Sequence, residues 1–165
     1  MINYTEKGIG LHLAIAKAGY VFKQENGIFV SDNDTQVQLI IDGYTLSNAQ
    51  IDKSANVDKY AETKFDKAVL GVSPAEMSGW SILRAEQAKY ELSLNTADCP
   101  SIVAEAAVRG ITVDVLAAKV KANATKFNFL RASIAGTSGK HRDAIKALTT
   151  FDDISAYDFT TGWMI

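Results

Sequence analysis

The sequence predicts an α+β fold that is predominantly helical. Apolar residues recur at helical spacing along most of the 165 residues, and two short β-prone runs flank an Asn-Gly pair near the N-terminus. Both prolines, Pro74 and Pro100, stand where a helix can begin. A hydrophobic fraction of 47% and a charged fraction of 22% are typical of a globular protein. We therefore expect a small N-terminal helix–β-hairpin–helix unit, a connector helix, and a C-terminal helical bundle that ends in a short strand.

Residues 1–46 are predicted to form a small α+β docking unit. Its first helix, over residues 9–18, ends at Gly19, a residue that tolerates the positive φ of a helix stop. We expect one apolar stripe of this helix to face the core. The stripe consists of Ile9, Leu13 and Ala16, widened by Leu11 and Ile15.

The Asn26-Gly27 pair between the two β-prone runs predicts a tight hairpin. Residues 31–34 then supply a cluster of Ser, Asp and Asn side chains of the kind that cap helix N-termini. The second helix of the unit should begin there and end at Gly43.

Residues 47–72 are predicted to form a long connector helix. Apolar residues recur only loosely there, among many charges, so the apolar stripe is narrow. Such a stripe can pack on its own chain or on a partner.

Residues 73–149 are predicted to form a helical bundle. Ser73 can cap a helix that Pro74 opens, and Glu76 completes a capping box. Trp80 lies on the apolar face of this helix, and we assign it to the bundle core. A shorter helix follows from Pro100 to the stop at Gly110.

Thr112 caps the longest helix of the bundle, which keeps a heptad-like apolar seam. The seam consists of Val113, Leu116, Val120, Phe127, Leu130 and Ile134. Asn123 is the polar residue on it. The helix either packs in a local antiparallel bundle or forms an intermolecular coiled coil whose register Asn123 fixes. Gly136 and Gly139 are expected to bracket a loop before another helix over residues 140–148.

Residues 150–165 are predicted to form a capped turn and a strand. Thr150 caps the turn, and the tail then alternates apolar and polar residues with period two. The apolar positions are Tyr157, Phe159, Trp163 and Ile165. Such a strand either closes the chain's own sheet or adds to the edge of a partner's sheet.

The residues that could take part in catalysis or bind a metal or cofactor do not form a recognisable motif. His12 has no ligand at metal-binding spacing, and Cys99 has no histidine close by. Residues 134–141 do not match a phosphate loop, because Ile134 replaces its first glycine and His141 its hydroxyl residue, although a plain anion site at a helix start near His141 stays open. Residues 32–43 depart from a calcium loop at its glycine and its final glutamate. We expect no enzyme and no cofactor.

Charge and hydropathy limit the classes of partner that the chain can bind. The net charge is −2, with 17 basic and 19 acidic residues well mixed, so we expect no nucleic acid. No apolar run approaches the roughly 18 residues that span a bilayer, so we expect no membrane. The polar segment 1–7 is unlike a signal peptide, and a single Cys99 is consistent with folding in a reducing cytoplasm.

Aromatic residues that the fold does not need are the candidate protein-binding residues, because aromatic side chains dominate binding hot spots. In the tail strand they are Tyr157, Phe159 and Trp163, and on the connector helix Tyr60 and Phe65.

Two segments resemble proteins associated with bacteriophage and prophage tails. Residues 5–44 resemble a short region of tail-fibre-linked proteins, in which a Gly-x-Gly-Leu-His motif precedes a polar hairpin and a helix that ends Ile-Ile-Asp. Residues 80–136 are similar to a helical module of tail proteins. Its pattern is carried by Trp80, Arg84, Glu86, Tyr90, Pro100, Arg109, Gly110, Ile134 and Gly136, with Gly139 just beyond.

The resemblance covers over half the chain and implies a tail-associated protein located in the virion and folded in the bacterial host. It implies fibre, baseplate or tail-tube proteins as partners, together with copies of the chain itself in a symmetric assembly. Two functions fit: a structural tail protein that attaches or braces fibres, or an assembly chaperone that is absent from the mature particle.

Overall fold

The computed structural model describes residues 2–163, of which 72% are helical, with seven α-helices and one β-hairpin among them. The described residues form two compact units. The first contains residues 2–63 and 135–163, and the second contains residues 64–134. The long helices α3 (Leu46–Ala68) and α6 (Val113–Ala147) contribute residues to both units.

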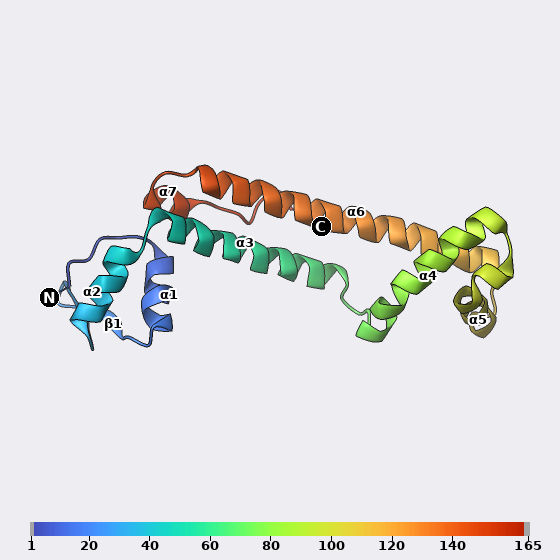
Figure 1. Cartoon of the computed structure of the whole chain (residues 1–165), viewed down its shortest axis with the longest axis horizontal. Coiled ribbons are helices and arrows are strands. Elements are labelled where there is room, and N and C mark those ends of the chain that lie inside the picture. Colours follow the sequence, from blue (N-terminus) through green and yellow to red (C-terminus); the bar gives the residue numbers. More distant parts are fainter. Residues whose placement is uncertain (1, 164–165) are drawn as a thin grey trace. The chain divides into compact units, whose positions relative to one another are not determined.

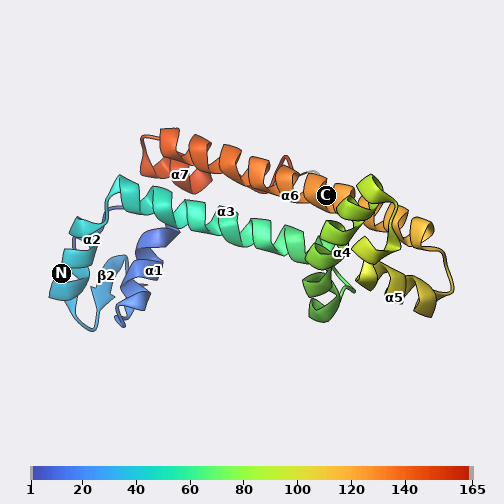
Figure 2. The ribbon, with the colours of Figure 1, turned by 45° about the vertical axis from the view of Figure 1, so that its right-hand side comes forward.

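The first unit begins with the predicted helix–hairpin–helix. It comprises α1 (Ile9–Lys17), β1 (Phe22–Glu25), β2 (Ile28–Ser31) and α2 (Asp34–Gly43) (Figure 2). The strands pair antiparallel with Glu25 opposite Ile28, so the turn contains only Asn26 and Gly27. Both turn residues have positive φ, of 50° and 82°, which is the geometry that joins two strands with a right-handed twist. The hairpin prediction is confirmed.

The predicted apolar stripe of α1 is confirmed at Leu11 and Ile15 and wrong at its other three positions. Leu11 and Ile15 are fully buried and pack with Val37 and Ile41 of α2 in the core of the first unit. The other three side chains predicted to face inward point outward instead: Ile9 is 71% and Leu13 is 48% exposed, and Ala16 is also exposed. Because apolar residues occupy every second position from Ile9 to Ile15, the helix has two apolar stripes, and the packing partner selects one of them.

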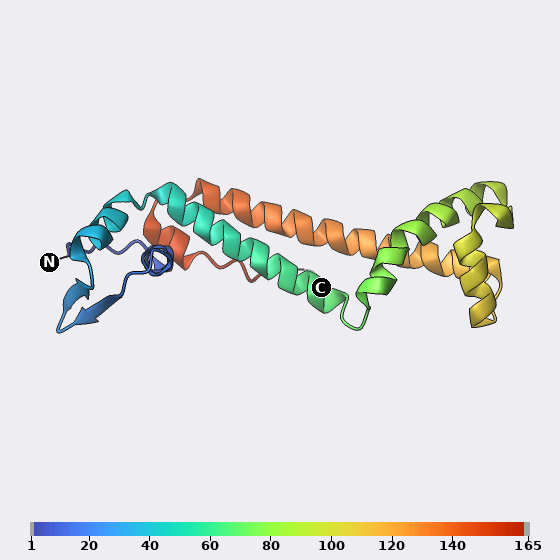
Figure 3. The ribbon, with the colours of Figure 1, turned by 60° about the horizontal axis from the view of Figure 1, so that its bottom comes forward.

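The rest of the first unit is built on an antiparallel helix pair. Residues 46–63 of α3 and 135–147 of α6 lie side by side in every view (Figures 1 and 3). The Gln50 amide donates to the carbonyls of Lys146 and Leu148, at 3.2 and 2.9 Å, where α6 ends. Thr150 then caps α7 (Phe151–Ala156), as predicted, and α7 places Ile154 in the core with Ala49.

The second unit contains α4 (Pro74–Ser93), a short 3-10 turn (Thr96–Asp98), α5 (Pro100–Arg109) and residues 113–134 of α6. Ser73 accepts a hydrogen bond from the Glu76 amide, as the capping box predicts. Gly110 ends α5 in the left-handed conformation, and the hydroxyl of Thr112 accepts from Val115 at the start of α6. The core of this unit consists of Tyr90, Cys99, Ile102, Ala106, Leu116 and Ala117.

A carboxylate of α4 holds the start of α5. Glu86 accepts hydrogen bonds from the backbone amides of Ser101 and Ile102, at 2.9 and 3.1 Å, and from the Ser101 hydroxyl at 2.7 Å. These amides have no partner within their own helix, because the first turn of any helix leaves its N–H groups unpaired. Glu86 therefore fixes α5 against α4 while it neutralises the positive end of the α5 dipole.

Two predictions about the C-terminal part are wrong. Residues 136–139 form no loop, because α6 continues through them to Ala147. Ile134, Ser138, His141 and Ile145 are buried on one face there, and this burial outweighs the helix-breaking tendency of two glycines. Among the described residues of the tail, 157–163, there is no strand, and Ile165 lies outside the described residues.

The continuity of α6 makes Gly136→Ala and Gly139→Ala stabilising. A Cβ at either position meets nothing within 4 Å, and neither glycine has a positive φ. Each substitution should raise the free energy of unfolding by about 0.5–1 kcal/mol, because alanine loses less backbone entropy in a helix. Thermal unfolding followed by circular dichroism measures the change.

The matched control is Gly110→Ala, which places a Cβ on a residue with φ of 64° and should lower the melting temperature. A loss of stability in the Gly136 and Gly139 variants would contradict the uninterrupted helix.

Candidate functional site

Four of the five predicted protein-binding residues lie together in the first unit, around His141. We call His141, Tyr60, Tyr157, Phe159 and Trp163 the tail cluster. The Tyr60 ring meets the rings of Phe159 and Trp163 in edge-to-face geometry, with centroids 5.8 and 5.5 Å apart. The Trp163 indole donates to the Phe159 carbonyl at 2.7 Å, which closes the tail on itself. These aromatic side chains pack on their own chain, and their role in binding a partner stays a prediction.

His141 is the polar centre of the tail cluster and is only 6% exposed. Its Nε2 lies 3.0 Å from the Thr161 carbonyl, which can only accept, so Nε2 carries the proton. In the neutral imidazole, Nδ1 then accepts from the Tyr157 hydroxyl at 2.8 Å. The imidazole also stacks on the Trp163 ring, at 5.7 Å and 23°. Both ring nitrogens are satisfied by the tail, which explains why this histidine can be buried.

Asp158 holds the turn between these aromatic residues. Its carboxylate accepts from the hydroxyl and the backbone amide of Thr160, at 2.6 and 2.8 Å. These hydrogen bonds lower the pKa of the Asp158 carboxyl. The Asp158 carboxylate is therefore already stabilised by hydrogen bonds within the tail.

Phe65, the fifth predicted binding residue, belongs to the second unit. Its ring meets that of Phe127 edge to face at 5.7 Å. Phe127 is also contacted by Trp80, at 5.1 Å and 79°. Trp80 is half-buried, so its predicted place in the bundle core is wrong. A helical repeat places a residue on an apolar face, but it does not say whether that face meets the core or a groove.

Trp80 lines a groove of about 770 Å³ between α4, α5 and α6, which we call the Trp80 groove. Its apolar wall contains Trp80, Leu83, Leu116, Val120 and Phe127. Its charged lining consists of Arg84, Arg109, Lys119 and Arg131 with Glu76 and Glu105. Tryptophan and arginine are the residues most enriched at the centres of protein interfaces. Sequence reasoning missed this groove because its lining comes from three helices.

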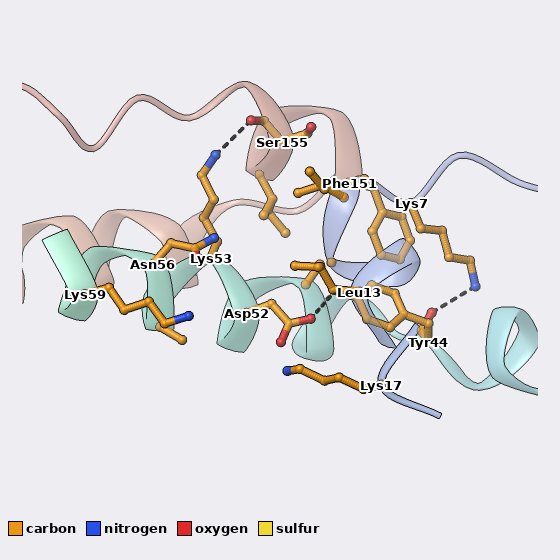
Figure 4. A pocket seen from close by; sticks show the side chains of 16 residues that line it. Lys7, Leu13, Lys17, Tyr44, Asp52, Lys53, Asn56, Lys59, Phe151 and Ser155 are labelled. Carbon is orange, nitrogen blue, oxygen red and sulfur yellow. Dashed lines mark hydrogen bonds between the residues drawn. The ribbon is translucent and has the colours of Figure 1, made fainter. Parts of the chain in front are cut away.

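A second hollow, of about 230 Å³, lies in the first unit and is shown in Figure 4. We call it the lysine pocket, because its lining includes Lys7, Lys17, Lys53 and Lys59. Leu13 and Phe151 provide apolar surface, and Asp52 adds a carboxylate to the lining (Figure 4). The lining is thus mixed in charge.

Two lysines of the pocket are committed to the fold. The Lys7 ammonium donates to the carbonyls of Ile41 and Tyr44, at 2.6 and 2.9 Å, at the C-terminal end of α2. The Lys53 ammonium donates to the Ser155 carbonyl at 2.8 Å, near the end of α7 (Figure 4). Cations at these positions satisfy unpaired carbonyls and oppose the negative ends of the helix dipoles. Burial lowers the pKa of Lys53, which is consistent with this structural use.

At one side of the lysine pocket, α1, the residue that follows α2, and α3 are in close contact. The Tyr44 hydroxyl donates to Asp52 at 2.6 Å, and burial followed by this hydrogen bond raises the pKa of Tyr44. Both side chains press on Gly10 of α1, where an added Cβ would lie 2.1 Å from the hydroxyl oxygen and 2.8 Å from the carboxylate. Gly10 therefore allows α1 to approach α3.

Metal chemistry receives no support from the described residues, which contain no group of three or more His, Cys, Asp or Glu able to hold a metal ion. Every buried side-chain nitrogen and oxygen among them has a hydrogen-bond partner. In that same part of the chain, no helix combines the length and the apolarity needed to cross a membrane.

Comparison of the chain with protein-family models, with curated proteins and with solved structures finds no match. The resemblance to phage tail proteins consequently rests on the sequence patterns quoted above.

The contact beside the lysine pocket predicts that Gly10→Ala is destabilising. The added methyl group overpacks against the Tyr44 hydroxyl, and such overpacking costs roughly 1–3 kcal/mol. Gly43→Ala, whose Cβ would meet nothing within 4 Å, is the control and should cost nothing. The double variant Gly10→Ala with Tyr44→Phe should lose less stability than the two single variants together, because the clashing oxygen is gone. Additive losses in chemical denaturation would contradict this contact.

The tail cluster predicts that Tyr157→Phe destabilises the first unit. The substitution keeps the ring but removes the proton that His141 Nδ1 accepts, and a buried acceptor without a donor costs about 1–3 kcal/mol. Tyr20→Phe is the matched control, because no hydrogen bond of the Tyr20 hydroxyl occurs within the described residues. Equal melting temperatures for the two variants would show that the tail is not held through His141.

Proposed function

We propose that this chain is a protein-binding component of a bacteriophage tail, which binds fibre or baseplate proteins and helps to attach or brace them. The role proposed is binding and not catalysis. The place in a phage tail is supported by the resemblance of residues 5–44 and 80–136 to tail-associated proteins.

The observation that carries the binding role is the Trp80 groove. A partly exposed tryptophan in a hollow of about 770 Å³, with arginines at its edge, has the composition of an interface centre. Its lining residues belong to helices, which hold a binding surface more rigidly than loops do. Trp80 and Arg84 are also residues that carry the resemblance, so the same side chains support both parts of the proposal.

The proposed function is tested by quantitative mass spectrometry of purified particles from the source phage or the induced prophage. We expect the chain at a fixed ratio of copies to the fibre or baseplate protein. A second particle preparation that carries Trp80→Ala should contain less of the chain. The control is Phe129→Ala, which alters an exposed aromatic residue of α6 that does not line the groove and should leave the ratio unchanged.

Absence of the chain from particles, together with its presence beside fibre protein in the lysate, would replace the structural role with that of an assembly chaperone. Failure to find it with any tail protein would refute the phage assignment.

A further inference from the structure

The Trp80 groove is elongated, and its walls are helices. On α6 the lining residues recur at each turn from Leu116 to Arg131, which corresponds to roughly 22 Å at 1.5 Å per residue. On α4 they run from Ala75 to Arg84. A site of this length fits a segment of about four helical turns.

The backbone of the groove restricts the kind of segment that can occupy it. The long walls are α-helices, whose N–H and C=O groups bond within the helix, so they offer no edge to which an extended strand could add. An occupant buried against the apolar wall must then satisfy its own backbone hydrogen bonds, which a helix does. The fitting occupant is an amphipathic helix with its apolar face on Trp80 and Phe127.

The charges at the groove specify an acidic partner. Glu105 is already paired with Arg109 at 2.7 Å. Arg84 donates to the neutral amide oxygen of Asn128 at 3.3 Å, and the Arg131 guanidinium lies 5.8 Å from the centre of the Phe127 ring. Lys119 has no ion-pair partner among the described residues. Within residues 2–163, three cations thus face the groove without a carboxylate partner, against one acid, Glu76.

The helices described in residues 2–163 do not include such a segment. The long helix α3 has four acidic and four basic residues, and α6 has two acidic and seven basic residues. The remaining long helix, α4, forms a wall of the groove. The acidic α2 has only ten residues, and its apolar side is buried against α1. A second copy is therefore a poor fit, and the occupant belongs to another protein.

From these observations we infer that the Trp80 groove binds an acidic amphipathic helix of a partner protein. The inference rests on the proposed function in one respect, namely that the groove is a protein-binding surface. It adds the conformation of the partner segment and the sign of its charge.

The test uses the full chain and two dye-labelled synthetic helical peptides of about 18 residues each, long enough to fill the groove. Both peptides carry leucines on one face, flanked by glutamates in the first peptide and by lysines in the second. Fluorescence anisotropy should show the glutamate peptide bound about tenfold or more tightly than the lysine peptide. Added salt should narrow this difference, because the charges at the groove are accessible to solvent.

Charge reversal inside and outside the groove locates the binding. Lys119→Glu combined with Arg131→Glu should weaken the glutamate peptide about tenfold, while both positions are exposed enough for the fold to survive. Lys126→Glu changes an exposed cation of the same helix that does not line the groove, and it should alter affinity less than about twofold. Circular dichroism confirms that each variant is folded.

Equal affinity for the two peptides, or equal effects of the groove and control variants, would overturn the inference. So would an apolar dye that binds at Trp80 while neither peptide does, since the site would then be one for small molecules. Self-association that Lys119→Glu abolishes, without peptide binding, would assign the groove to a second copy. These outcomes are separate from the particle test, because peptide binding does not depend on whether the chain is in a virion.

Discussion

The first unit depends on the pairing of two helical segments that lie far apart in the sequence, residues 46–63 of α3 and 135–147 of α6. The paired helices bury Val57 and Ile145 completely, and polar contacts set their register: Asp58 accepts from the Ser138 hydroxyl and from Arg142 at 3.2 and 3.0 Å. The ion pair is half-exposed and contributes little by itself, so burial supplies most of the stability and the polar groups select the alignment. The other elements of this unit follow from the pair. Because α6 ends where Gln50 can reach its last carbonyls, α7 turns back toward the core, and the tail after it comes within reach of His141.

The second unit has a corresponding constraint in the polar contacts that join α4 to its neighbours. Glu86 binds the first turn of α5, and the Tyr90 hydroxyl donates to Asp114 of α6 at 2.6 Å, a hydrogen bond that raises the pKa of Tyr90. Glu91 also pairs with Lys121 of α6. All three contacts lie toward the C-terminal part of α4, next to the core around Ile102. In the part of the chain that the structure describes, the N-terminal part of α4, which carries Trp80, has only the contact of Arg84 with Asn128, and a groove remains open there beside α6. The position of the groove along α4 thus follows from where its polar anchors are.

Local chemistry made much of the fold predictable. Asn26-Gly27 permits the positive φ of the hairpin turn, and Ser73, Thr112 and Thr150 mark helix starts through hydrogen bonds that span only three residues. The errors arose where distant residues decide. The two glycines of α6 predicted a loop because helix propensity is a property of the local sequence. The burial of His141 and Ile145, which keeps the helix continuous, depends on residues that are distant in the sequence. The tail alternates aromatic and polar residues, but its aromatic side chains contact different partners, Tyr157 with His141 and Phe159 with Tyr60, and no strand forms among residues 157–163. The tail cluster was therefore foreseeable as a set of residues, but not as an intramolecular contact, and the Trp80 groove required the packing of three helices.

The Trp80 groove differs from the lysine pocket and the tail cluster in how many of its charged groups have partners within the chain, and not in residue type. All three contain charged or polar groups beside aromatic or apolar side chains. In the lysine pocket the ammonium groups of Lys7 and Lys53 are bound by helix carbonyls, and Asp52 lies among the rest. In the tail cluster both nitrogens of His141 and the carboxylate of Asp158 have partners within the tail. Polar groups that are already satisfied gain little from a partner, since binding only exchanges one hydrogen bond for another. Arg84, Lys119 and Arg131 lack a carboxylate partner within the described residues and stand next to a tryptophan that its own unit covers only in part. A partner that supplies both apolar surface and carboxylates gains binding free energy from each of them at this groove. The other two surfaces offer no such gain from carboxylates, and this difference is the physical basis for placing recognition in the Trp80 groove.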